Sequence, residues 1–253
     1  MTRRTPVLLF MLWLLPSAVP VFAEDADRQF AGYVSDQETR FKDYVWNFVD
    51  EFEDTWARSQ YYWARSYMFG SSHLSFCDSV DLTYFAGHGN ASTIWPSSAD
   101  GACYLGDKAW GSHSTASRAG DLEYVVFHSC KVLEMSGDWR GRWRNTYETR
   151  SQPRPFAGLH LAMGFRTNHY TGAGAGPWAA DEFAENLEDG DAVRTAWVEA
   201  VEDSLWLVGW DSSKNRAAVF YIRPHANETR SQNGSADRRY GDADYLLDAY
   251  YME

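Results

Sequence analysis

Two short segments carry the residues with which this chain could do covalent chemistry. The first reads Asp-Leu-Thr-Tyr-Phe-Ala-Gly-His-Gly-Asn over 81–90, an apolar run that ends in His88-Gly89. The second reads Leu-Glu-Tyr-Val-Val-Phe-His-Ser-Cys-Lys over 122–131, an apolar run that ends in Ser129-Cys130. A thiolate that attacks a carbonyl carbon, with an imidazole to manage the protons, is the minimum set for nucleophilic cysteine catalysis. The N–H groups of Gly89 and Cys130 are candidates for holding the developing oxyanion.

These residues can meet only if the two apolar runs are strands of one sheet. The carboxyl ends of parallel strands meet at one edge, where ligands bind and catalytic groups gather. Three further apolar runs, 159–165, 205–210 and 217–222, are also expected to be buried strands.

Helical periodicity separates and precedes these runs. An amphipathic helix is predicted over 37–59, a second over 179–187 that stops at Gly190, and a third that is capped by Asp191. Strands that alternate with helices predict an α/β fold with a largely parallel central sheet flanked by helices. The polar stretch 225–244 is expected to be a loop, and 245–251 to dock back on the body of a single domain that spans 24–253.

The first 23 residues have the parts of a secretory signal peptide. Arg3 and Arg4 precede an apolar stretch at 7–15, and Ala23-Glu24 follows small residues suited to cleavage. We expect an exported protein, secreted or periplasmic, without stable membrane insertion after cleavage. The alternative is an uncleaved membrane anchor, for which the apolar stretch is short.

The formal net charge of the 253-residue chain is −12, which argues against binding a phosphate backbone, so no nucleic-acid partner is expected. The chain has three cysteines, and in an oxidising compartment an odd number implies one disulfide and a spare thiol, or a bond between chains. Three pairings are open. A disulfide between Cys77 and Cys103 would link the two segments that flank the His88 strand and would leave Cys130 as the free thiol.

The order of the motifs, His-Gly first and Ser-Cys 42 residues later, resembles the caspase-like clan CD of cysteine peptidases. The likeness extends through Tyr-Phe-Ala-Gly-His-Gly, Ser-Cys-Lys-Val-Leu and a late Ala-Glu-Asn-Leu…Val-Arg-Thr-Ala-Trp, over roughly 75–210, and is nearest to bacterial secreted caspase-like proteins. It implies a caspase-like sandwich in which Cys130 is the nucleophile, His88 is the acid–base residue and Gly89 contributes to the oxyanion site. It also implies a peptide or protein substrate and no cofactor. An acidic pocket residue in some relatives suggests Trp210 and Asp211 as substrate-binding residues.

Simpler explanations exist for each candidate. Cys130 can be a buried structural cysteine, His88 a turn residue and Asp211 part of a turn. His128 shares a strand face with Cys130, so it can tune the thiol, pack in the core, or join His88 and Cys130 in a zinc site. Packing is favoured and no metal is expected. Gly172 to Pro177 is expected to be a flexible loop, and the other histidines receive no role.

Three functions therefore compete. The leading one is an exported caspase-like cysteine endopeptidase. The second is a catalytically inactive caspase-like module that binds peptide. The third is a carbohydrate-active or carbohydrate-binding protein, which the abundant aromatic and acidic residues would suit.

Overall fold

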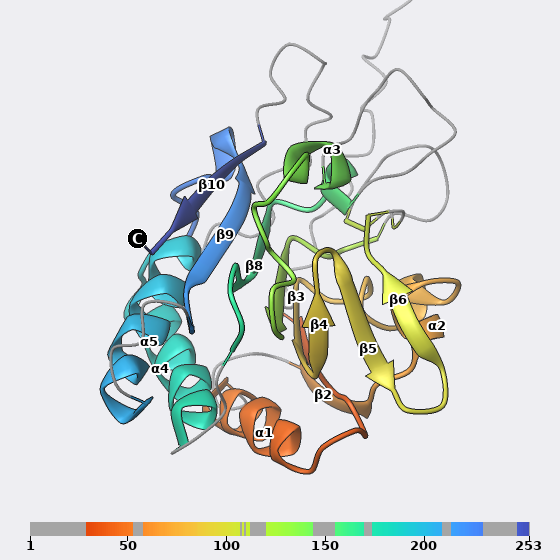
Figure 1. Ribbon diagram of the computed structural model, residues 1–253, viewed down its shortest axis with the longest axis horizontal. Helices are drawn as coiled ribbons and strands as arrows, with labels where there is room; N and C mark the ends of the chain where they lie inside the picture. The colour runs from red at the N-terminus through yellow and green to blue at the C-terminus, as the bar shows by residue number, and fades with distance from the viewer. Residues whose placement is uncertain are drawn as a thin grey trace, which may run out of the picture.

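A seven-stranded sheet forms the centre of the molecule (Figure 1). The computed structural model describes residues 29–52, 58–106, 108, 110–111, 120–143, 155–169, 174–208, 214–229 and 247–252. The strand order is β10-β9-β8-β7-β3-β1-β2. The strands are β1 Gln29–Val34, β2 Arg58–Trp63, β3 Leu82–Ala86, β7 Tyr124–His128, β8 Leu161–Phe165, β9 Ala217–Ile222 and β10 Leu247–Tyr251.

The sheet is mostly parallel. Strands β2, β1, β3, β7 and β8 run the same way, whereas β9 is antiparallel to β8 and β10 is antiparallel to β9. Every residue of β3, β7, β8 and β9 is buried, which is why these strands read as continuous apolar runs.

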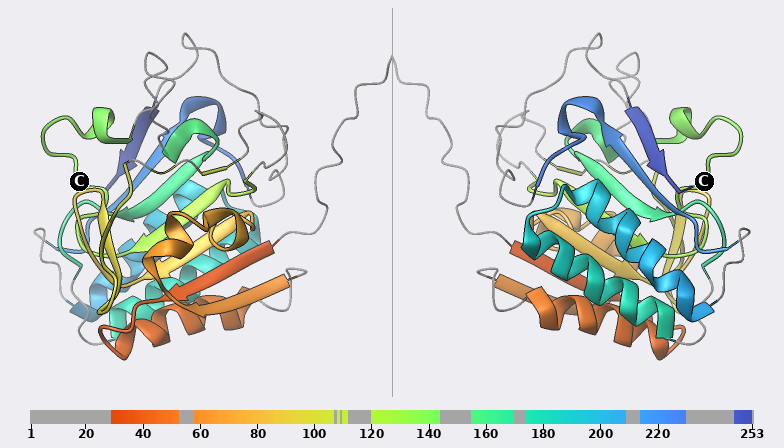
Figure 2. Two further views of the ribbon diagram at one scale, coloured as in Figure 1. Left: turned by 90° about the vertical axis from the view of Figure 1, so that its right-hand side faces the viewer. Right: turned by 90° about the vertical axis from the view of Figure 1, so that its left-hand side faces the viewer.

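Layers cover both faces of this sheet. Helices α1 Arg40–Phe52, α4 Ala175–Asp189 and α5 Val193–Val208 lie side by side over one face (Figure 2, right). The opposite face packs on α2 Ser66–Phe69, on α3 Trp139–Trp143 and on a small antiparallel sheet. This sheet consists of β4 His88–Asn90, β5 Thr93–Ser97 and β6 Gly101–Tyr104, and the single turns are η1 His73–Ser75, η2 Pro155–Ala157 and η4 Arg223–His225. The predicted fold class is confirmed, and the arrangement is the one that the caspase-like resemblance implies.

Three predicted elements differ from the structure, one of them the loop Gly172–Pro177, whose last three residues form the start of α4. The prediction of a strand at 205–210 is wrong, because residues 205–208 continue helix α5. Val201 and Leu205 lie four residues apart, as on one face of a helix, and both are buried. Helix α1 is also shorter than predicted: it covers 40–52, and β2 begins at Arg58. The strands β1 and β2 and the small sheet had no counterpart in the sequence analysis.

The strand order reverses at β1. Strand β2 lies on one side of β1, and β3, which follows β2 in the chain, pairs with the other side. Such a switch point opens a crevice beyond the carboxyl ends of the two strands, and His88 follows β3 directly there. None of the helices within the described ranges is long and apolar enough to cross a membrane.

Candidate functional site

The two predicted catalytic residues occupy matching positions on neighbouring strands. Ala86 of β3 pairs with His128 of β7, so His88 and Cys130 each lie two residues beyond this pair. The main chain of Gly89 packs against the Cys130 segment so closely that a Cβ added there would lie 2.9 Å from the carbonyl oxygen of Cys130. The fold therefore brings the His-Gly and Ser-Cys motifs together at one edge of the sheet.

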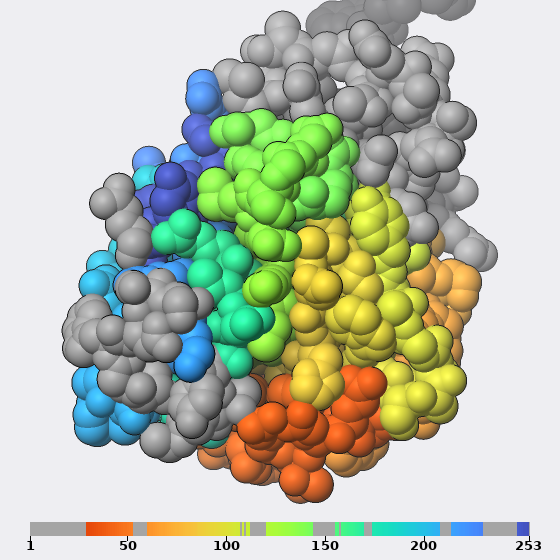
Figure 3. Space-filling view, viewed as in Figure 1, coloured from red at the N-terminus to blue at the C-terminus, as the bar shows by residue number. Residues whose placement is uncertain are grey.

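Main-chain hydrogen bonds hold the Cys130 segment between its neighbours. Lys131 N–H donates to the carbonyl of Thr167 at 2.9 Å, beyond β8, and Ser92 N–H donates to the carbonyl of Val132 at 3.0 Å. Lys131 adopts a left-handed conformation with φ of 52°, which turns the chain sharply after Cys130. In Figure 3 the segment after β7 (light green) lies exposed between β4 (gold) and the segment after β8 (green-blue).

A carboxylate that the sequence analysis did not identify holds the His88 ring. His88 Nε2 lies 2.8 Å from Glu38 Oε1, and the ring packs edge-on against Phe41 with centroids 5.2 Å apart. The His88 side chain is 46% exposed, so solvent and a ligand can reach it. Glu38 lies in the turn between β1 and α1 and also pairs with Arg40. The switch point thus supplies the group that orients the imidazole.

The Cys130 thiol is partly exposed and contacts the main chain of His169. His169 N–H donates to Cys130 Sγ at 3.3 Å, and Sγ lies 3.6 Å from the His169 carbonyl oxygen. An amide N–H directed at sulfur places partial positive charge where a thiolate would form. Both hydrogen bonds of the sulfur go to His169, and the His88 ring bonds to Glu38, so thiol and imidazole share the edge without a direct hydrogen bond.

His128 is a buried packing residue, as the sequence analysis favoured. One ring nitrogen, Nδ1, lies 2.6 Å from the Tyr84 hydroxyl, and the other, Nε2, lies 3.0 Å from Nε2 of His169. Both ring nitrogens therefore have partners other than Cys130.

The pair of histidines beneath Cys130 is kept neutral. Burial, with the nearby His169, lowers the pKa of His128 well below its usual value. Burial, with the Arg40 guanidinium, lowers the pKa of His169 to about 3, although a hydrogen bond with Asn215 opposes the shift. Because both rings are uncharged, they form a polar but neutral pair beside the Cys130 segment.

The expected disulfide between Cys77 and Cys103 is not formed, and both residues are thiols. They are buried in the same apolar cluster beneath the small sheet, where a thiol packs as a small hydrophobic group. Burial, with the nearby Asp78 and Cys103, raises the pKa of Cys77 well above its usual value, which keeps this thiol protonated and unreactive.

Some predicted residues lie outside the described ranges: the signal peptide with its cleavage position at Ala23-Glu24, the substrate-binding candidates Trp210 and Asp211, and the first two residues of the Gly172–Pro177 loop. Glu38 and His169 are the site residues that the sequence analysis missed. His169 follows the 161–165 strand by four residues, so the rule that selected His88 and Cys130 could have found it. Glu38 follows β1, which had not been predicted.

Comparisons with known proteins identify the family of the chain. The family model described as a domain of unknown function, DUF6345, matches residues 27–247. No curated protein matches. A solved structure, the complex of Porphyromonas gingivalis RgpB pro- and mature domains, is similar at 10% sequence identity with a TM-score of 0.47. The match covers 79% of this chain and 48% of that one, so the chain spans about half its length. A likeness at this level says nothing about activity.

Proposed function

The chain belongs to the DUF6345 family, a domain of unknown function, and we propose from its own site that it is a cysteine endopeptidase. One observation carries the proposal: His88 and Cys130 project from matching positions at the carboxyl ends of adjacent parallel strands, beside a strand-order switch. This is where an open α/β sheet gathers its reactive groups.

The proposed reaction uses an acyl-enzyme. The Cys130 thiol gives its proton to His88, the thiolate adds to the carbonyl carbon of the scissile peptide bond, and the N–H groups of Gly89 and Cys130 receive the oxyanion. As the C–N bond breaks, His88 gives a proton to the leaving amine, which departs and leaves a thioester on Cys130. Water then attacks the thioester, His88 takes a proton from that water, and the carboxylic acid leaves with the thiolate restored.

The surroundings of each residue fit its role. The Glu38 carboxylate fixes the orientation of the His88 ring. Without this contact, an exposed histidine would rotate among several orientations. The main-chain N–H of His169 supports charge on the sulfur of Cys130. The absence of a side chain at Gly89 lets its backbone lie against the Cys130 segment.

The test compares the purified mature chain with Cys130→Ala on a proteome-derived peptide library, with new termini read by mass spectrometry. The control Cys103→Ala also removes one cysteine but lies in the core, and circular dichroism verifies that each variant is folded. We expect cleavage by the parent and by Cys103→Ala and none by Cys130→Ala.

Two outcomes would overturn the proposal. Equal cleavage by the parent and Cys130→Ala would assign the activity to another group. No cleavage by a folded parent whose Cys130 reacts with iodoacetamide would favour the peptide-binding module.

We also propose that the chain works outside the cytoplasm, because its first 23 residues have the composition of a cleavable signal. N-terminal sequencing of protein recovered from the periplasm or medium tests this, and a mature terminus at Glu24 is expected. An intact Met1 on membrane-bound protein would contradict it.

A further inference from the structure

A second cluster of reactive side chains lies at the opposite edge of the sheet. His160 directly precedes β8, and His225 ends the η4 turn that follows β9. Since β9 runs antiparallel to β8, its end lies beside the start of β8, and the register pairs Leu161 with Tyr221. Cys130 and His88 lie beyond the other ends of these parallel strands, so the two clusters are separate.

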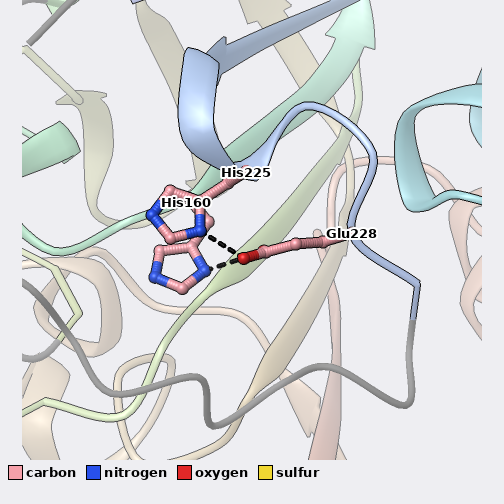
Figure 4. Close-up of side chains that lie close together, drawn as sticks. All are labelled: His160, His225 and Glu228. Atoms are coloured by element: carbon pink, nitrogen blue, oxygen red, sulfur yellow. Dashed lines mark hydrogen bonds and ion pairs between the residues drawn. The ribbon is translucent and has the colours of Figure 1, made fainter.

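Glu228 joins the two histidines. His160 Nδ1 lies 3.0 Å from Glu228 Oε2, and His225 Nδ1 contacts Glu228 Oε1 (Figure 4). The two imidazole rings are stacked with centroids 3.6 Å apart and an angle of 15° between their planes. The stacking directs Nδ1 of both rings toward one carboxylate.

All three side chains are buried. His160 is 4%, His225 is 3% and Glu228 is 8% exposed, and one donor atom from each lies within 4.8 Å of the others. The Tyr124 hydroxyl donates to Glu228 Oε2 at 3.1 Å and thereby fixes the orientation of the carboxylate. Ligating carboxylates in metal proteins are commonly held by such outer hydrogen bonds.

We propose that His160, His225 and Glu228 bind a divalent transition-metal ion, for which zinc is the best fit. Two imidazoles and one carboxylate are the three protein ligands of one class of zinc site, in which water takes the fourth position. With zinc–nitrogen bonds of about 2.0–2.1 Å, two ligand atoms of a tetrahedral ion lie about 3.3 Å apart. The observed 3.0 Å between His160 Nδ1 and Glu228 Oε2 is close to this separation, whereas the stacked rings and the shorter contact of His225 with Glu228 would have to open to admit the ion. The ion takes the position of the protons that the imidazoles now share with the carboxylate.

The ion would act as a structural clamp. His160 belongs to the start of β8, whereas His225 and Glu228 belong to the segment after β9. That segment also reaches α5, because Val193 N–H donates to the Glu228 carbonyl at 2.8 Å and Ala192 bridges to Thr229. One ion would fasten the start of β8 to the segment after β9, which is itself hydrogen-bonded to the start of α5. Burial of all three ligands favours this role over catalysis.

The test strips the full chain with EDTA, dialyses it against Zn²⁺ and measures bound zinc by mass spectrometry of the metal. About one ion per chain is expected for the parent and for His88→Gln and Cys130→Ala, which control for binding at the other edge. Glu228→Gln, a nearly isosteric change, and His225→Gln are expected to weaken zinc binding at least about 100-fold. Zinc is expected to raise the melting temperature of the parent but not of these two variants.

X-ray absorption of the zinc-loaded parent gives an answer that needs no variant. Nitrogen and oxygen ligands at about 2.0–2.1 Å without sulfur at about 2.3 Å are expected. The proposal is overturned if the parent binds no stoichiometric zinc, if sulfur is a ligand, or if folded Glu228→Gln and His225→Gln bind as the parent does. Those results would leave a buried hydrogen-bonded cluster, and they would leave the peptidase proposal untouched.

Discussion

His88 is held by a carboxylate from a distant turn rather than by the thiol that it would serve. The 2.8 Å contact between His88 Nε2 and Glu38 Oε1 spans 50 residues of sequence and sets the direction of an exposed ring. An imidazole that moves protons gains its effect from such positioning.

Replacing this carboxylate tests the positioning. Glu38→Gln is expected to lower kcat about 10-fold on a peptide that the parent cleaves. A positioned acid–base group accelerates a reaction by more than this factor, and the variant would lose part of that acceleration. The fold should be retained, because Glu38 lies on the surface. The matched control is Asp43→Asn, an exposed acidic residue on α1. Equal kcat values for the two variants would show that Glu38 has no part in orienting His88.

The neutral histidines beneath Cys130 predict a pH dependence of stability. The folded-state pKa of His169 is about 3, below the usual 6.5, so the unfolded chain binds more protons below pH 6.5. This stabilisation is present above pH 6.5 and is lost as the pH falls toward 3. Between pH 7 and pH 5, His169 should account for about 2 kcal/mol of the fall in the free energy of unfolding.

Urea unfolding at pH 7, 6 and 5 measures this contribution. His169→Gln should show a shallower fall than the parent. Parallel curves for the parent and His169→Gln would mean that the ring is not kept neutral by the fold.

At the scale of elements, aromatic packing fixes α1 on the sheet. Phe48 stacks on Tyr84 of β3 with ring centroids 4.5 Å apart, and it also stacks on Phe183 of α4 at 5.8 Å. One side chain thus joins two helices to the strand that precedes His88. The position of the Glu38 turn depends on this packing, because the turn leads directly into α1.

Truncation of this side chain measures the packing. Phe48→Ala is expected to lower the free energy of unfolding by about 3–5 kcal/mol, because it removes a fully buried ring and leaves a cavity. Trp46→Ala, on the same helix but 50% exposed, should cost about 0.5 kcal/mol. Denaturant unfolding compares the two, and similar losses would contradict the packing described for α1.

At the scale of the molecule, the three cysteines differ in access. Cys77 and Cys103 are enclosed in the core, and Cys130 alone is partly exposed at the sheet edge. A thiol reagent should therefore distinguish them without any knowledge of the substrate.

Titration of unreduced protein with a chromogenic disulfide tests this distinction. The native chain should react at about one thiol, identified as Cys130 by peptide mapping, and the denatured chain at all three. A single reactive thiol after denaturation would show that Cys77 and Cys103 are joined in a disulfide. Rapid reaction at Cys77 in the native protein would contradict its burial.

The α/β class and the strands that lead to His88 and Cys130 could be predicted from local features of the chain. Continuous apolar runs identify doubly covered parallel strands, and helical spacing with Gly190 as a stop located α4 and α5. These features are local, so they can be read from neighbouring residues. The apolar run at 205–210 was misassigned because a short apolar run suits a buried strand and a buried helix end equally well.

The surroundings of those residues could not be predicted in this way. The pairing of β3 with β7, the reversal at β1 and the meeting of His160 with His225 and Glu228 join segments far apart in the chain. Such contacts depend on strand order and register, which the alternation of polar and apolar residues does not specify. The cysteines show the same division: their odd number suggested a disulfide, but their burial in one apolar cluster accommodates them as thiols.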